Sequence, residues 1–333
     1  MILQTVKKVF IIILAIIIFT TAFSGCQQKA DNKALTKITV VLDYLPNTNH
    51  TGLYVAKDLG YFEANGLEVT IVQPPENGAV SLVGAGRAQF GVSFQEELAM
   101  ALTAEAPIPV TAVAAIIQHN TSGILSLKKN NILRPKDLMG KRYASWQTPI
   151  ETPLLTSIMK TDGGDFSKIQ MIPNTATNVL AALATNVDAV WVYYGWDVIA
   201  AQVKKVDFNY FAFKDINPVF DFYTPILIAN NEFLTLNPEV AKKFLESTAK
   251  GYDYSISNPD LAAKILLKNA PETDAEIATK SQDYLVSQYK ADAQVWGWID
   301  KTRWTNFYDW LYANKVISKP LGSNGFTNDY LTK

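Results

Sequence analysis

The fold class of this 333-residue chain is first indicated by residues 36–72, whose sequence is TKITVVLDYLPNTNHTGLYVAKDLGYFEANGLEVTIV. Thr36–Leu42 is an apolar, β-branched run typical of a strand, and a loop of turn-forming residues follows it. Thr51–Leu59 is predicted to be a helix that ends at Gly60, and Leu67–Val72 to be a second strand. A strand, a helix and another strand in this order are typical of a βαβ unit with parallel strands.

The alternation of strands and helices continues along the chain in two series. Further strands are predicted at Ala88–Ser93, Val110–Ile117, Lys141–Ser145, Ile169–Ile172, Ala189–Tyr194 and Asn209–Phe213. Helices are predicted between them, at Ala79–Ala85, Glu96–Ala104, Thr152–Lys160, Thr177–Ala184 and Trp196–Val203. The last part of the chain is predicted to be helical over Pro238–Ser257, Pro259–Lys268, Asp274–Tyr289 and Lys301–Asn314. We therefore expect an α/β protein with mostly parallel sheets.

Two extended apolar segments, Ser122–Leu127 and Thr224–Ala229, stand between these series. We expect them to join two α/β lobes as a two-strand hinge. Lobe I is predicted to comprise residues 36–124 and 225–333, and lobe II residues 125–224. Ligands of open α/β sheets bind beyond the carboxyl ends of the strands, so we expect a ligand between two facing strand ends, enclosed by closure about the hinge.

Composition excludes several classes of function. Hydrophobic residues make up 48% of the chain and charged residues 18%, which is too apolar for a disordered protein. The formal net charge of −1 offers no basic surplus for binding nucleic acid. A single Cys excludes an internal disulfide and Cys-based metal sites, and two His leave little room for multi-His metal chemistry.

The first 25 residues are predicted to be a signal peptide. Lys7 and Lys8 precede the apolar run Val9–Phe23, which is shorter than the roughly 20 residues of a membrane-spanning helix. Ser24 and Gly25 then precede Cys26, and this junction resembles a bacterial lipobox, in which the Cys is lipidated. Residues 26–35 are predicted to be a tether. The expectation is a lipid-anchored chain on the extracytoplasmic face of a membrane; the alternative is an ordinary signal peptide with a chance Cys.

Polar and aromatic side chains collect directly after the predicted strands. The segments are Asp43–Gly52, Ser93–Glu96, Gln118–Gly123, Ser145–Thr148, Tyr193–Asp197 and Asp221–Tyr223. Rings can stack on the faces of a flat heterocycle while amides and carboxylates bind its edge. A free phosphate is not expected, because it would call for Arg, Lys or a Gly-rich loop.

Some of these residues have two interpretations that the sequence leaves open. His50 and His119 are either a shared ligand-binding floor or two loop histidines with structural partners. Asp197 is either a helix N-cap or a ligand contact, and Trp196 either core or ligand contact. A metal site formed by the two His and Asp43 is not expected.

Longer motifs resemble a known family. LDYLPNTNHTGLYVA at Leu42–Ala56 is similar to the signature of the thiamine-pyrimidine family, in which Trp usually stands in place of Tyr44. Further similar motifs lie at Gln89–Gln95, Ala114–Gly123, Val187–Asp197, Phe213–Pro225 and Gly325–Leu331. The resemblance implies the type II periplasmic-binding fold. It also implies one of two activities: a receptor of an ABC importer for thiamine precursors, or a fungal type of synthase that uses pyridoxal phosphate, iron and a Cys-rich motif.

The single Cys and the export signal favour the receptor branch. The resemblance then implies a monomer without cofactor or catalytic residues, partnered by a permease and an ATPase. Its ligand would be N-formyl-4-amino-5-aminomethyl-2-methylpyrimidine or hydroxymethylpyrimidine, with riboflavin, thiamine or an anion as alternatives. The ligand-binding residues that it implies are Asp43, Tyr44, Asn47, His50, Gln95, Gln118, His119, Trp146, Tyr193, Tyr194, Trp196 and Asp221.

Overall fold

The computed structural model describes residues 34–75, 78–173 and 178–332. Contacts along the chain divide it into Met1–Leu35 and Thr36–Lys333, and the fold given below is that of the second unit. The predicted signal peptide and Cys26 lie outside the described residues. No helix within the described ranges is both long and apolar enough to cross a membrane.

The first sheet has five strands in the order β2-β1-β3-β10-β4. They are β1 (Thr36–Val41), β2 (Leu67–Val72), β3 (Phe90–Ser93), β4 (Val110–Ala115) and β10 (Ile226–Asn230). β1 is parallel to β2 and β3, whereas β10 is antiparallel to both β3 and β4. The strands from β1 to β4 thus follow the sequence prediction, and β10 joins them from much later in the chain.

The second sheet repeats this arrangement, in the order β7-β6-β8-β5-β9. Its strands are β5 (Ser122–Leu127), β6 (Arg142–Ser145), β7 (Gln170–Pro173), β8 (Ala189–Tyr193) and β9 (Phe208–Ala212). Here β5 is the strand that runs antiparallel to its two neighbours, β8 and β9. Each sheet therefore has four strands in one direction and one antiparallel strand, so the sheets are mostly parallel as expected, and β10 and β5 are the exceptions.

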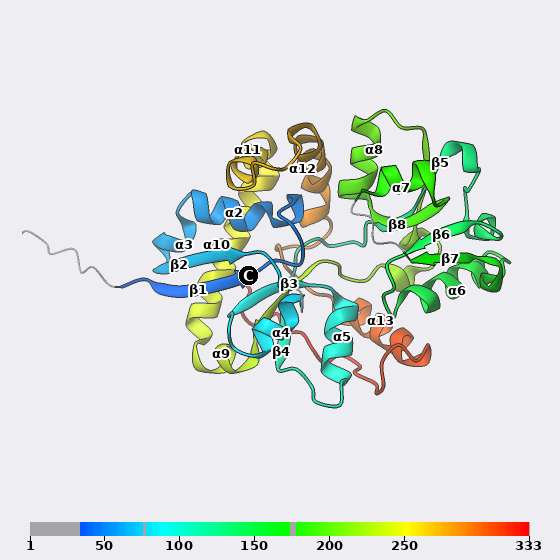
Figure 1. Cartoon of the computed structure of the whole chain (residues 1–333). Helices are drawn as coiled ribbons and strands as arrows, with labels where there is room; N and C mark the ends of the chain where they lie inside the picture. Colours follow the sequence, from blue (N-terminus) through cyan, green and yellow to red (C-terminus); the bar gives the residue numbers. More distant parts are fainter. Residues whose placement is uncertain (1–33, 76–77, 174–177, 333) are drawn as a thin grey trace, which may run out of the picture. The chain divides into compact units, whose positions relative to one another are not determined.

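Figure 1 shows the helices, and their bounds lie close to the predicted ones. They are α2 (Thr51–Asp58), α3 (Tyr61–Ala64), α4 (Gly78–Gly84), α5 (Gln95–Thr103), α6 (Glu151–Thr161), α7 (Val179–Thr185), α8 (Ile199–Val203), α9 (Asn231–Leu236), α10 (Pro238–Ser257), α11 (Pro259–Asn269), α12 (Ala275–Tyr289) and α13 (Lys301–Ala313). The sequence did not predict the short helices α3 and α9. It also missed a π-helical turn, η5 (Tyr194–Val198), that precedes α8.

The chain crosses between the two sheets twice, at residues 116–121 and 213–225. The segments expected to be crossings, β5 and β10, are strands within the sheets, because their backbone groups pair with neighbouring strands along their length. The lobe boundaries at 124/125 and 224/225 remain a prediction.

The packing of α10 against α2 supports the loop that follows β1. Gly52 and Gly251 let the two helices approach so closely that a Cβ on Gly251 would overlap the Gly52 carbonyl oxygen. Next to this contact, the Tyr252 hydroxyl donates to the Asn49 carbonyl at 2.6 Å, and the Tyr289 hydroxyl donates to the Thr48 carbonyl at 2.6 Å. Both tyrosine rings are buried, so the loop is held by the helical core beneath it.

Candidate functional site

Asp43 and His50 form the centre of the loop after β1. The backbone N–H of Asn47 donates to His50 Nδ1 at 3.2 Å, so the imidazole proton must lie on Nε2. Nε2 therefore donates to Asp43 Oδ1, at 2.6 Å. The His50 side chain is fully buried, while 7% of the Asp43 side chain is exposed. His50 thus orients the carboxylate, and Asp43 is the member of the pair that reaches the surface.

The other two predicted residues of this loop behave differently. Asn47 caps the short helix η1 (Thr48–His50), with its side-chain oxygen accepting from the Asn49 N–H at 2.9 Å. Its amide nitrogen donates to the Leu45 carbonyl at 3.0 Å. Tyr44 is 54% exposed, so its ring is accessible for stacking. Asn47 shapes the loop, and Tyr44 presents an aromatic face to solvent.

Two carboxyl groups at the start of α5 lie at the neighbouring strand end, beyond β3. Ser93 donates to Glu97 Oε2 at 2.6 Å. Burial raises the pKa of Glu97, and the negative charge of Asp43 raises it further. The two acids are near each other because β1 and β3 are neighbouring strands. Burial also raises the pKa of Glu96, to about 8. Glu96 belongs to the polar segment Ser93–Glu96, but neither Glu96 nor Glu97 is among the ligand-binding residues predicted from the sequence.

Tyr193, at the carboxyl end of β8, is the point where the second sheet meets these groups. Its ring stacks on Phe94, with centroids 6.4 Å apart and an interplanar angle of 15°. Its hydroxyl lies 3.4 Å from the Thr224 hydroxyl. Burial raises the pKa of Tyr193, and nearby carboxylates add to the rise; they are Glu96, Asp43 and Asp197. Tyr193 therefore contacts Phe94, directly after β3, and Thr224 of the second crossing.

Asp197 lies in the π-helical turn η5, close to Tyr193. Burial raises its pKa to about 6, although hydrogen bonds from the backbone N–H groups of Tyr193 and of Asp197 itself oppose the rise. Trp196, the preceding residue, is partly exposed. Tyr194 packs away from this point, with its ring stacked on Tyr284 of α12 at 4.6 Å between centroids.

Gln95 and Gln118 are both buried, and the side-chain amides of both form hydrogen bonds with backbone groups. Gln95 accepts from the Tyr223 N–H at 2.9 Å and donates to the Trp304 carbonyl at 3.3 Å. Gln118 donates to the Trp298 carbonyl at 3.0 Å. These amides connect the crossings to α13 and to the segment before it, so a ligand would have to compete with bonds that hold the fold.

Trp146 lies beyond the end of β6, with 40% of its surface exposed. Its indole N–H donates to the Trp191 carbonyl at 2.8 Å, and its backbone N–H donates to Glu151 at 3.1 Å. Glu151 is itself buried and accepts from Tyr143 and Ser145, at 2.7 and 2.6 Å. The Trp191 carbonyl therefore holds the Trp146 ring, and the buried Glu151 carboxylate holds its backbone.

His119 and Asp221 link the two crossings. His119 Nδ1 lies 2.6 Å from Asp221 Oδ2, and Arg303 of α13 lies 3.3 Å from the same oxygen. The hydrogen bond to Asp221 raises the pKa of His119. Burial alone would raise the pKa of Asp221, but the His119 and Asn120 hydrogen bonds and the Arg303 charge lower it. The two residues form a charged hydrogen bond between the two crossings, residues 116–121 and 213–225, which take the place of the expected two-strand hinge.

This network predicts a pH-dependent stability. The Asp221 contribution is present above its unfolded pKa of 3.8 and is lost as pH falls through the lowered folded value. The His119 contribution is present below 6.5 and is lost as pH rises through the raised folded value. Asp221→Asn should cost about 1–3 kcal/mol near pH 6, measured by urea unfolding, and less near pH 9.

The matched control is Asp292→Asn. Asp292 lies 3.1 Å from His119 Nε2, but its side chain is 73% exposed, so the change in stability should be small. Equal losses for the two variants, or a loss at Asp221 that does not vary with pH, would contradict the hinge assignment.

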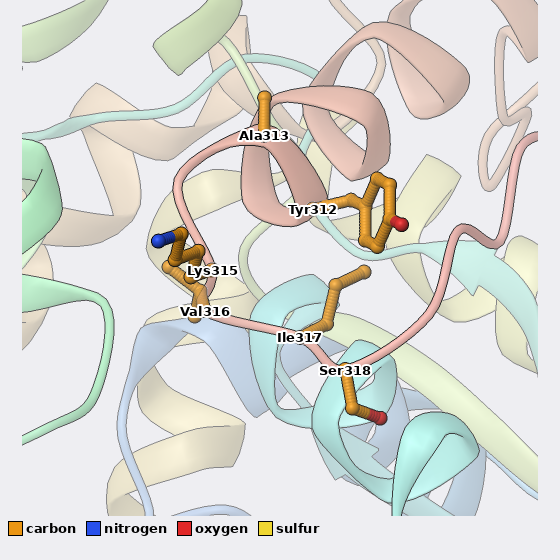
Figure 2. A pocket seen from close by; sticks show the side chains of 6 residues that line it. All are labelled: Tyr312, Ala313, Lys315, Val316, Ile317 and Ser318. Atoms are coloured by element: carbon orange, nitrogen blue, oxygen red, sulfur yellow. The ribbon is translucent and has the colours of Figure 1, made fainter.

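A surface pocket at the end of α13 lies apart from these residues (Figure 2). It is lined by Tyr312, Ala313, Lys315, Val316, Ile317 and Ser318. None of the predicted site residues lines it. Within the described ranges, no group of three or more His, Cys, Asp or Glu is placed to hold a metal ion.

The structure thus brings together Asp43, Phe94, Glu96, Glu97, Tyr193 and Asp197, where strand ends of the two sheets meet. Of the twelve predicted residues, Asp43 and Tyr193 belong to this group, and His50 supports it. His119 and Asp221 form the separate hinge network. Two acids in the first turn of a helix that follows a strand closely are the signal that could have revealed Glu96 and Glu97.

Comparisons with known proteins agree with the motifs. A model of the family described as NMT1/THI5 like matches residues 47–262. A formylaminopyrimidine-binding protein of Halalkalibacterium halodurans is 26% identical, over 94% of this chain and 96% of the relative. A 4-amino-5-hydroxymethyl-2-methylpyrimidine phosphate synthase of Saccharomyces cerevisiae, THI13, is 25% identical, over 89% of this chain and 88% of the relative.

Among solved structures, the alkanesulfonate-binding protein SsuA of Xanthomonas axonopodis pv. citri matches with a TM-score of 0.67. The match covers 88% of this chain and 98% of that protein at 14% identity, so it bears on the fold alone. The fold is that of the type II periplasmic binding proteins, which confirms the predicted fold class.

Proposed function

The chain belongs to the NMT1/THI5-like family, and on that premise we propose that it is the solute-binding receptor of an ABC importer for a thiamine-precursor pyrimidine. Similarity to a formylaminopyrimidine-binding protein extends over almost the whole of both chains. The ligand proposed is N-formyl-4-amino-5-aminomethyl-2-methylpyrimidine or hydroxymethylpyrimidine. Another flat heterocycle, such as thiamine or riboflavin, is the alternative within the same kind of receptor.

One observation carries the proposal: an aromatic pair, Phe94 and Tyr193, surrounded by carboxyl groups at the facing strand ends. Aromatic rings offer faces on which a planar heterocycle can stack. Carboxyl groups accept hydrogen bonds from amino substituents at the ring edge. An amino-substituted pyrimidine has both properties, whereas an anion would face the charge of Asp43 and Glu97 without a cation that touches either carboxylate in the described contacts.

The second candidate is a pyrimidine-precursor synthase, because family relatives in yeast carry that name. The single Cys of the sequence supports the receptor instead, since the Cys-rich motif implied for that branch needs several. The predicted signal peptide and lipidation at Cys26 support it as well. The proposal therefore includes a monomer tethered to the outer face of the membrane, with a permease and an ATPase as partners.

The first test is thermal unfolding of the protein with candidate ligands. At a free ligand concentration 100 times the Kd, binding should stabilise the fold by about 2.7 kcal/mol, which is about 4 °C for a domain of this size. Formylaminopyrimidine should give the largest shift. Native mass spectrometry of the protein as purified should also detect retained ligand.

The outcomes separate the alternatives. A shift with riboflavin alone would change the ligand but keep the receptor. Formation of a pyrimidine product from pyridoxal phosphate and iron, lost on substitution of His50 or His119, would favour the synthase. No shift with formylaminopyrimidine, hydroxymethylpyrimidine or thiamine would refute the pyrimidine assignment.

A further inference from the structure

Glu96 is a buried carboxyl group without a hydrogen-bond partner on one of its oxygens. It is the second residue of α5, and only 8% of it is exposed. Oε2 is buried and accepts no hydrogen bond from any described residue. Buried polar atoms in folded proteins are almost always paired, so an orphan oxygen beside the site indicates a missing partner.

The groups around Glu96 are acidic or phenolic. Glu97 lies next to it on α5, and the charge of Glu96 raises the pKa of Tyr193 on β8 and of Tyr308 on α13. Asp43 and Asp197 act on the same tyrosine, Tyr193, from the β1 loop and from η5. These surroundings stabilise the neutral acid over the carboxylate.

The pKa of Glu96 agrees with this environment. Burial is the largest cause of its rise to about 8, and the charge of Glu97 adds to it. The backbone N–H of Glu96 opposes the rise, as expected in the first turn of a helix. At pH 7 the side chain is therefore mainly a carboxylic acid, which has one hydrogen to donate and one oxygen to accept.

We propose, on the basis of the function proposed above, that Glu96 binds the ligand as a neutral acid. Its O–H donates to a ring nitrogen, and its carbonyl oxygen accepts from the amino group on the adjacent ring carbon. The ligand class is then an uncharged heterocycle with an amino group beside a ring nitrogen. Phosphorylated forms of the same ring are excluded, because their charge would lie among Asp43, Glu97 and Asp197.

The protonation state of Glu96 decides which form of the ligand ring it can pair with. A carboxylate would need a protonated ring as its partner, whereas a neutral acid pairs with the neutral ring. Glutamine reproduces the neutral acid, because its amide has a donor and an acceptor and never ionises. Leucine has a similar size and offers neither group.

The experiment is calorimetric titration of N-formyl-4-amino-5-aminomethyl-2-methylpyrimidine into the full chain between pH 7 and pH 10, above the pKa of about 6 of Asp197. The wild-type Kd should be flat below about pH 8 and rise about tenfold per pH unit above it. Glu96→Gln should bind within about threefold of the wild type at pH 7 and lose this rise. Glu96→Leu should have a Kd that does not vary with pH and is at least tenfold higher than that of the wild type at pH 7, because the ring nitrogen and amino group stay unpaired.

Glu97→Gln is the matched control. It removes the neighbouring charge that raises the pKa of Glu96, so the rise in Kd should persist with its midpoint at lower pH. Titration of Tyr193 does not contribute to the change in Kd, since burial keeps its pKa above the pH range of the experiment. A second ligand, 2-methylpyrimidine, lacks the amino group. The wild type and Glu96→Leu should bind it with nearly the same Kd.

The results that overturn the inference are distinct from those that overturn the function. Binding by Glu96→Gln as weak as by Glu96→Leu would show that the carboxylate is needed. A wild-type Kd that does not change with pH would exclude the acid as donor. Should the wild type bind no pyrimidine at any pH, the proposed function itself fails. If Glu96→Leu does not fold, as judged by circular dichroism, the pH dependence of the Kd of Glu96→Gln still tests whether Glu96 binds as a neutral acid.

Discussion

Replacing Gly251 with alanine should lower the free energy of unfolding by about 3 kcal/mol. The added Cβ would overlap the carbonyl oxygen of Gly52 and lie 3.0 Å from the Ala56 Cβ. Backbone atoms cannot rotate away as a side chain can, so α10 must shift from α2. Urea unfolding followed by circular dichroism measures the loss.

The control is Lys250→Ala, one residue earlier on the same helix. The Lys250 side chain is 55% exposed and pairs with Glu246 on the surface, so its loss should change stability by less than about 1 kcal/mol. Because Tyr252 anchors the β1 loop next to this contact, Gly251→Ala should also weaken ligand binding. Unchanged stability would mean that the two helices are farther apart than the structure places them.

Asp43→Asn should weaken binding of the pyrimidine by about 10–100-fold, the effect of one hydrogen bond to a charged group. Asparagine keeps an oxygen that can accept from His50 Nε2, so the fold should be almost unaffected. Asp43→Ala leaves that buried N–H unpaired and should cost a further 1–3 kcal/mol of stability, roughly. Calorimetric titration and urea unfolding, measured on both variants, separate the two effects.

Asp58→Asn is a suitable control, because Asp58 lies on α2 and pairs with Lys268 on the surface, at 2.6 Å. It removes the same charge without touching the strand ends. An affinity for the pyrimidine that is unchanged in Asp43→Asn would show that the ligand binds elsewhere.

The sequence predicted the order of strands and helices because local patterns specify them. A strand was predicted at Thr36–Leu42 from its apolar, β-branched residues, and β1 occupies almost the same residues, Thr36–Val41. The antiparallel strand β10 could not be placed, since its partners β3 and β4 lie more than a hundred residues earlier. Strand pairing over such separations leaves no local signal.

The site could be predicted as a region but not as a set of contacts. Asp43 and Tyr193 follow strands, and that position alone indicated them. Gln95 has the same kind of position, yet its amide is used by Tyr223 and Trp304, far along the chain. Burial of Glu96 depends on α13 and β8, so the sequence around it could not reveal its raised pKa.

The late position of β10 has a consequence for how the polypeptide is built. Strands β5 to β9 form one continuous stretch, Ser122–Ala212, so a chain growing from its N-terminus can complete the second sheet first. Until β10 is made, β3 has an open edge and β4 lacks its strand partner, and other chains could pair with both. Nascent chains that stop before residue 226 should therefore contain a finished second sheet beside an unfinished first one, and should aggregate through that edge.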